Sequence, residues 1–174
     1  MNKYLFLILI ILTGCKEKKL KKTKEILITP KILKQSPKSN LIKENYFDNT
    51  LFHRVVKDFI IQGGNSDNPK ISSKRRNIGK YLLPPDTKKG FKHKRGTISM
   101  PSSEIENPHK LASPYEFFIV VAKNGAPHLN GNYTAFGEVT KGMDVADKIA
   151  NLKVDKREMP INNVFINIEI ISNK

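Results

Sequence analysis

Short apolar runs rich in β-branched and aromatic residues constrain the fold of this chain more than any other feature. Residues 51–56 and 59–62 are two such runs; Lys57-Asp58 separates them and Gly63-Gly64 ends the second. Runs of this length, bounded by turn-forming residues, are typical of β-strands. Similar runs follow at 96–100, 116–121, 135–139 and 164–171. The last alternates apolar and polar residues, which favours a half-buried strand.

One segment in the C-terminal half has helical periodicity. Apolar residues recur at helical spacing within 143–152, with Asp144 near the start and Lys148 near the end, where the helix dipole favours these charges. Many short strands with one or two helices favour an antiparallel barrel or sandwich over a βαβ fold. The expected class is therefore mainly β.

The N-terminus has the features of a targeting signal. An apolar run at 4–12 follows Lys3, and it is shorter than the roughly 20 residues that a membrane-spanning helix needs. The run ends in Leu12-Thr13-Gly14-Cys15, which resembles the lipobox of bacterial lipoproteins, where the cysteine is acylated and becomes the mature N-terminus. A buried helix, or an ordinary signal peptide with a coincidental cysteine, is the alternative. Cys15 is the only cysteine of the chain, which favours lipidation.

We therefore expect a signal peptide at 1–14 and a lipoprotein anchored in a bacterial cell envelope, on the periplasmic or extracytoplasmic side. A diacylglycerol and an N-acyl chain such as palmitate on Cys15 would satisfy the rule that stable anchoring needs more than one chain.

Positive charge is concentrated just after this segment. The chain carries a formal net charge of +15, and residues 16–45 contain 10 lysines against 3 glutamates. Such a run stays solvated and suits a tether; binding to anionic lipid headgroups is the alternative. Nucleic-acid binding would rest on net charge alone, because no nucleic-acid motif is present, and we do not expect it.

The most specific motif lies in the first pair of predicted strands. Residues 52–64, Phe-His-Arg-Val-Val-Lys-Asp-Phe-Ile-Ile-Gln-Gly-Gly, resemble the signature of the cyclophilins. These are peptidyl-prolyl cis-trans isomerases built on a closed, antiparallel, nominally eight-stranded barrel capped by helices. Family-like segments follow in order at 96–100, 116–119, 129–131, 136–139 and 142–144. The resemblance implies this barrel with one or two helices and a domain at 43–174.

The part before this domain looks shortened relative to the family. Only 30 residues separate Cys15 from 46–50, where the family places two strands and a helix. We expect 15–42 to hold the basic tether and shortened N-terminal elements, with one strand at 25–28 and a helical turn after Ser39. A barrel that lacks a strand would have an unpaired edge.

Rotation about an X–Pro bond sets the chemistry that the resemblance implies. The barrier is about 18–20 kcal/mol because amide resonance must be lost. A catalyst needs only a site that fits the twisted amide better than the planar one, so we expect no cofactor and no metal. As the amide twists, the proline nitrogen regains a lone pair and accepts a hydrogen bond, so a fixed donor stabilises the transition state.

By resemblance, Arg54 is that donor, Gln62 binds the substrate backbone and helps to orient Arg54, and Phe59 completes the catalytic group. The implied substrate-binding residues are Ile60, Pro101, Ser102, Phe118, His128, Leu129 and Tyr133. Without the resemblance, the apolar ones would be core side chains, Arg54 an ion-pair partner and Gln62 a strand polar residue.

Four positions depart from the usual family pattern. His128 stands where many members have tryptophan, Tyr133 where many have histidine, and Glu116 where glutamine is more usual. Pro101 removes a backbone N–H from the implied groove. The remaining histidines, His53, His93 and His109, gain no role from the resemblance and are regarded as structural or exposed.

The expected function is isomerisation of X–Pro bonds that assists the folding of envelope or secreted proteins. The expected partners are proline-containing segments of unfolded or secreted proteins, and the membrane through the lipid. The alternative is a proline-binding chaperone or scaffold lipoprotein of the same fold without turnover.

Overall fold

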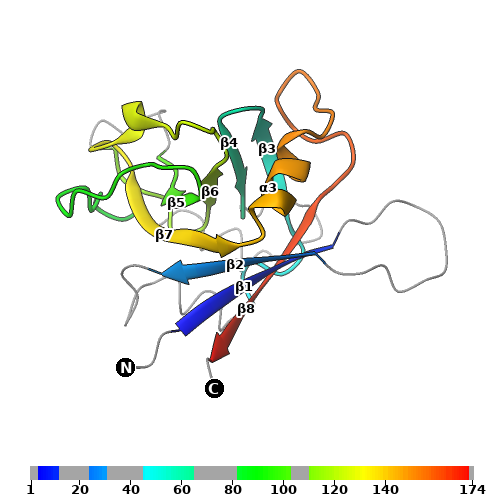
Figure 1. The fold of residues 1–174 in the computed structure, drawn as a ribbon, viewed down its shortest axis with the longest axis horizontal. Coiled ribbons are helices and arrows are strands. Elements are labelled where there is room, and N and C mark those ends of the chain that lie inside the picture. Colours follow the sequence, from blue (N-terminus) through cyan, green and yellow to red (C-terminus); the bar gives the residue numbers. More distant parts are fainter. Residues whose placement is uncertain (1–3, 12–23, 31–44, 65–81, 103–109, 173–174) are drawn as a thin grey trace.

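The computed structural model describes residues 4–11, 24–30, 45–64, 82–102 and 110–172 (Figure 1). Within them, the strands are β1 (Tyr4–Ile11), β2 (Lys24–Pro30), β3 (Thr50–Val56), β4 (Ile60–Gly63), β5 (Thr97–Met100), β6 (Phe117–Val120), β7 (Thr134–Lys141) and β8 (Phe165–Ser172). The helices are the 3-10 turn η1 (Pro127–Leu129) and the α-helix α3 (Met143–Ala150). The prediction of a mainly β chain is confirmed. Cys15, Ser39 and His109 lie outside the described residues.

All strand pairings are antiparallel and form a curled sheet in the order β1-β2-β7-β5-β6-β4-β3-β8. β1 pairs with β2 and also with β8, and these three strands lie side by side in Figure 1. β2 contains the predicted strand at 25–28 and pairs with β7. Residues 4–11 of the apolar run that was expected to be a signal peptide thus form a strand in this structure.

The β3–β4 hairpin carries the family-like signature. Asp58 in its turn has φ +57°, a left-handed conformation that aspartate tolerates better than most residues. The register pairs Arg54 with Gln62 and Val56 with Ile60. Because directly opposite residues share a face, Arg54 and Gln62 lie on the same side of the sheet.

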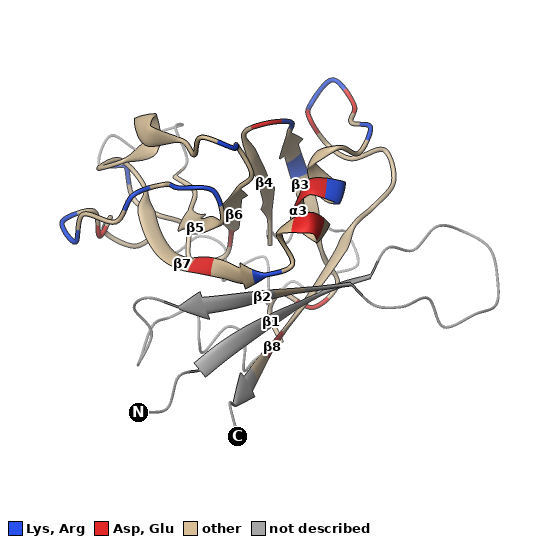
Figure 2. Ribbon diagram, in the orientation of Figure 1, with Lys and Arg blue, Asp and Glu red and all other residues tan. Residues whose placement is uncertain are grey.

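The two faces of the central strands bury two separate apolar clusters. Ile61 and Ile119 belong to the main core, whereas their neighbours Ile60 and Phe118 belong to a smaller cluster with Leu129. This alternation follows from the two-residue period of a strand. Strands β4, β5 and β6 carry no Asp, Glu, Lys or Arg (Figure 2).

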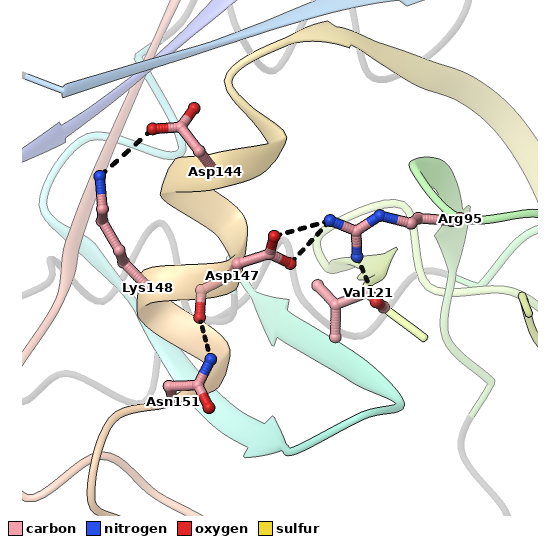
Figure 3. A network of polar contacts seen from close by, with 6 residues as sticks. All are labelled: Arg95, Val121, Asp144, Asp147, Lys148 and Asn151. Atoms are coloured by element: carbon pink, nitrogen blue, oxygen red, sulfur yellow. Dashed lines mark hydrogen bonds and ion pairs between the residues drawn. The ribbon is translucent and has the colours of Figure 1, made fainter. Parts of the chain in front are cut away.

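Helix α3 packs against β2, β3 and β4 and contributes Val145, Ala146, Ile149 and Ala150 to the main core. An ion pair between Asp147 of α3 and Arg95 joins the helix to the loop before β5 (Figure 3). Arg95 Nη2 donates to both Asp147 carboxylate oxygens, at 2.8 and 2.7 Å, and Nη1 donates to the Val121 carbonyl oxygen. The helix follows its predicted position. No helix among the described residues is long and apolar enough to cross a membrane.

Candidate functional site

A groove of about 480 Å³ opens on the face of the sheet that carries the smaller cluster. Its lining residues are Arg54, Phe59, Ile60, Gln62, Pro101, Ser102, Phe118, His128, Leu129 and Tyr133. The structure therefore brings together all the residues that the resemblance placed at the catalytic and substrate-binding positions. Their individual roles stay predictions.

Strand pairing explains why residues far apart in sequence line one groove. Arg54 on β3 is paired with Gln62 on β4, and Gln62 is paired with Phe118 on β6. Phe118 is in turn paired with Ser99 on β5. Each pairing keeps the two side chains on one face, so a single row crosses four strands.

Aromatic and aliphatic side chains form the apolar part of the groove. Ile60, Phe118 and Leu129 are buried. The ring of Phe59 lies 5.3 Å from that of exposed His128, centroid to centroid, and Tyr133 meets Phe118 edge-on at 5.9 Å. A concave apolar surface of this size, with polar groups at one side, suits a small ring such as proline.

His93 lies behind Phe118 and is fully buried. Its ring is stacked on the Phe118 ring at 6.1 Å, and it contacts Tyr133 edge-on at 6.5 Å. Its Nδ1 lies 3.1 Å from Asn130 Oδ1 and its Nε2 3.0 Å from Ser99 Oγ. Because an amide oxygen only accepts, Nδ1 carries the proton and Nε2 accepts from the Ser99 hydroxyl.

Burial lowers the pKa of His93 below its usual 6.5, and the hydrogen bond with Asn130 opposes the shift only in part. The backbone N–H of His93 also donates to Asn130 Oδ1, at 2.7 Å. Asn130 directly follows η1, so His93 connects the segment that carries His128 and Leu129 to the floor of the groove.

Arg54 stands at the polar side of the groove and is paired with a residue 104 positions away. Its Nε donates to Glu158 Oε2 at 2.7 Å, and the two side chains are 40% and 42% exposed. Gln62 Nε2 lies 3.5 Å from Glu116 Oε1 instead. Within the described part of the chain, no side-chain hydrogen bond joins Gln62 to Arg54, so the side-chain contact that orients Arg54 in this structure comes from Glu158.

Glu116 lies between two polar partners on β3 and β4. His53 Nε2 is 3.3 Å from Glu116 Oε1, the oxygen that Gln62 also approaches. Burial on its own would raise the pKa of Glu116, but hydrogen bonds from His53, Gln62 and Ser113 and the charge of His53 together lower it. A carboxylate is therefore stable beside Gln62.

The sequence analysis assigned no role to three residues that lie at or near this site: Glu158, His93 and Glu116. The sequence did show that Glu116 replaces the glutamine that is more usual in the family. Nothing local to residue 158 connects it with Arg54. In the part of the chain that is described, no three His, Cys, Asp or Glu side chains gather closely enough to hold a metal ion.

Comparison with known proteins agrees with this geometry. The family model for cyclophilin type peptidyl-prolyl cis-trans isomerases matches residues 39–170. A peptidyl-prolyl cis-trans isomerase of Acinetobacter baylyi is 34% identical over 134 residues, 75% of this chain and 67% of that protein. The isomerase-like 2 protein of Rhizopus delemar is 36% identical over 72% of this chain but only 22% of its own length.

Solved structures give the same result at the level of the fold. The crystal structure of a Cryptosporidium parvum cyclophilin type isomerase, determined in the presence of the dipeptide Ala-Pro, has a TM-score of 0.70 and 26% sequence identity, over 97% of this chain and 99% of that one. Its likeness extends beyond the matched segment of the family model. The chain belongs to the cyclophilin-type peptidyl-prolyl cis-trans isomerase family.

Proposed function

We propose that the groove between Arg54 and Leu129 is where this isomerase rotates X–Pro bonds, with Arg54 as the donor to the twisted amide. The observation that carries the proposal is the single groove that holds Arg54 and Gln62 beside the apolar slot of Phe59, Ile60, Phe118 and Leu129. The Ala-Pro dipeptide named with the Cryptosporidium structure supports a proline-containing ligand.

The mechanism follows from what each part of the groove favours. The slot takes the proline ring, because burial of its apolar surface is favourable by about 25 cal/mol per Å². With the ring held, the residue before proline rotates about the amide bond. Arg54 is always charged and its two Nη groups remain as donors when Nε binds Glu158, so they can stabilise the lone pair that develops on the proline nitrogen. Gln62 binds the peptide backbone.

Substitution of Arg54 tests this assignment. We expect Arg54→Ala to fold and to lose about 100-fold in kcat/KM for a proline peptide, because one fixed donor to the transition state is removed. Arg157→Ala, which removes an 87% exposed arginine outside the groove, is the control and should keep the wild-type rate. A folded Arg54→Ala protein with the wild-type rate would contradict the mechanism. Peptide binding without turnover by the unmodified protein would favour the scaffold function.

We further propose that the protein is a lipoprotein of the bacterial envelope, acylated at Cys15, and that its clients are secreted or envelope proteins. The apolar run, the Thr13-Gly14-Cys15 sequence and the lysine-rich segment after it support this. In the unprocessed chain, β1 would close an eight-stranded barrel by pairing with β2 and β8. Cleavage before Cys15 would remove β1 and leave both of those edges free, so the two arrangements exclude each other.

A further inference from the structure

The segment that presents Glu158 is a tightly hydrogen-bonded turn after α3. Asp155 N–H donates to the Met159 carbonyl oxygen at 2.8 Å, and Glu158 N–H donates to the Asp155 carbonyl oxygen at 3.1 Å. Asp155 Oδ1 also accepts from the backbone N–H groups of Arg157 and Met159, at 2.8 and 2.9 Å. The N–H groups of Met159 and then Arg157 lower the pKa of Asp155. These hydrogen bonds stabilise the turn in the conformation that the structure shows.

The turn is joined to the strand that carries Arg54. Val55 N–H donates to the Glu158 carbonyl oxygen at 2.8 Å, so residue 158 is fixed to β3 through its backbone. Its carboxylate then meets Arg54 Nε at 2.7 Å. Backbone and side chain of Glu158 therefore contact adjacent residues of β3, and the carboxylate cannot move away without rotation of its own side chain.

The backbone conformation of Glu158 is unfavourable for its residue type. Its φ is +64°, in the left-handed region where glycine is free of strain and asparagine is tolerated. A glutamate here costs conformational energy that glycine would not cost. An exposed ion pair contributes little to stability, so the pair with Arg54 offsets little of this conformational strain.

The contact also affects how Arg54 meets a substrate. An unpaired arginine side chain has many rotamers, whereas the bond at Nε fixes the plane of the guanidinium. Nη1 and Nη2 stay available at the groove, which Arg54 lines. Gln62, the other polar residue of the groove on the neighbouring strand, is engaged with Glu116.

We propose that Glu158 is a positioning residue for catalysis: it holds the Arg54 guanidinium in the orientation in which its Nη groups meet the proline nitrogen of the twisted amide. Glu158 does not itself touch the substrate. This inference rests on the proposed role of Arg54.

Glu158→Gly separates positioning from structural support. Glycine relieves the strain at φ +64° and removes the carboxylate, so the melting temperature should stay equal or rise. We expect kcat for a proline peptide to fall about tenfold, because misplaced catalytic groups cost rate steeply, while KM changes less than about twofold. Glu158→Gln keeps an acceptor oxygen at the same reach and should retain most of the activity. Lower stability with an unchanged kcat would overturn the proposal.

Asp147→Asn is the matched control, because it weakens the Arg95–Asp147 pair, which is also partly exposed and 2.7 Å long and lies away from the groove. It should leave kcat unchanged. In an Arg54→Lys background, which has no guanidinium to orient, Glu158→Gly should have less than about a twofold effect on kcat. A full tenfold effect in that background would overturn positioning through Arg54.

The two proposals fail in different ways. If Arg54→Ala keeps the wild-type rate, the role of Arg54 is wrong and Glu158 has no catalytic function. If Arg54→Ala is inactive and Glu158→Gly keeps the wild-type kcat, the role of Arg54 stands and only the positioning by Glu158 is wrong.

Discussion

His93 combines full burial with a role in holding the groove. Because its pKa is lowered by burial, the folded protein binds the proton less readily than the unfolded chain does, whose reference value is 6.5. Stability therefore rises with pH in this range and is lost as the pH falls below 6.5 toward the folded pKa. The neutral ring is the form that accepts from Ser99 and donates to Asn130.

We predict that the free energy of unfolding, from urea titrations, decreases as the pH is lowered from about 7.5 through the unfolded-state value of 6.5. His93→Gln should flatten this dependence. Glu116 also has a lowered pKa, but its reference value of 4.5 places its loss of stability at more acid pH. An NMR titration that gives His93 a pKa at or above 6.5 would contradict the prediction, even if His93→Gln fails to fold.

At the scale of elements, two glycines on either side of η1 have similar backbones and different surroundings. Gly125 has φ +72° and Gly131 has φ +76°. A Cβ at Gly125 would lie 2.6 Å from the His93 carbonyl oxygen and 3.1 Å from Lys94 Cα, both backbone atoms. A Cβ at Gly131 would meet nothing within 4 Å. The loop of His93 thus leaves no room for a side chain at Gly125, whereas a side chain at Gly131 would have open space.

We predict that Gly131→Ala lowers the free energy of unfolding by about 1 kcal/mol, because alanine is strained in the left-handed conformation. Gly125→Ala adds a backbone clash and should cost about 3 kcal/mol or more. Urea unfolding of the two variants measures the difference. Equal losses of stability in the two variants would mean that the backbone at His93 can move away from residue 125 without a cost in free energy.

At the scale of the whole molecule, the fate of residues 4–11 decides how the sheet is completed. The structure pairs them as β1 with β2 and β8, whereas the lipoprotein proposal removes them. We predict that protein purified from its native cells begins at Cys15 and carries acyl mass, and that Cys15→Ser remains unprocessed or soluble. Mass spectrometry decides between these outcomes. An intact Met1 would contradict processing and would leave β1 as part of the working fold.

Much of the fold is encoded in short stretches of sequence. The hairpin at 51–63 could be predicted because its β-branched runs, its Lys57-Asp58 turn and its terminal glycines act over a few residues. The helix at Met143 followed from apolar spacing in the same way. The residues of the groove followed from the resemblance of these same segments to a family whose pairing brings them together.

Contacts between distant residues had no such local signal. Arg54 and Glu158 are 104 positions apart, and neither residue type nor spacing indicates that they meet. His93 is buried and supports Phe118 because β5, β6 and the segment after η1, which are separate in sequence, all pack around it. The sequence alone determined the hairpin at 51–63, the later strands and α3, because those depend on neighbours along the chain, but it did not indicate that residues 4–11 form β1. Only the tertiary structure decided which charges and rings support the groove, because that depends on how the curled sheet brings separate segments into contact.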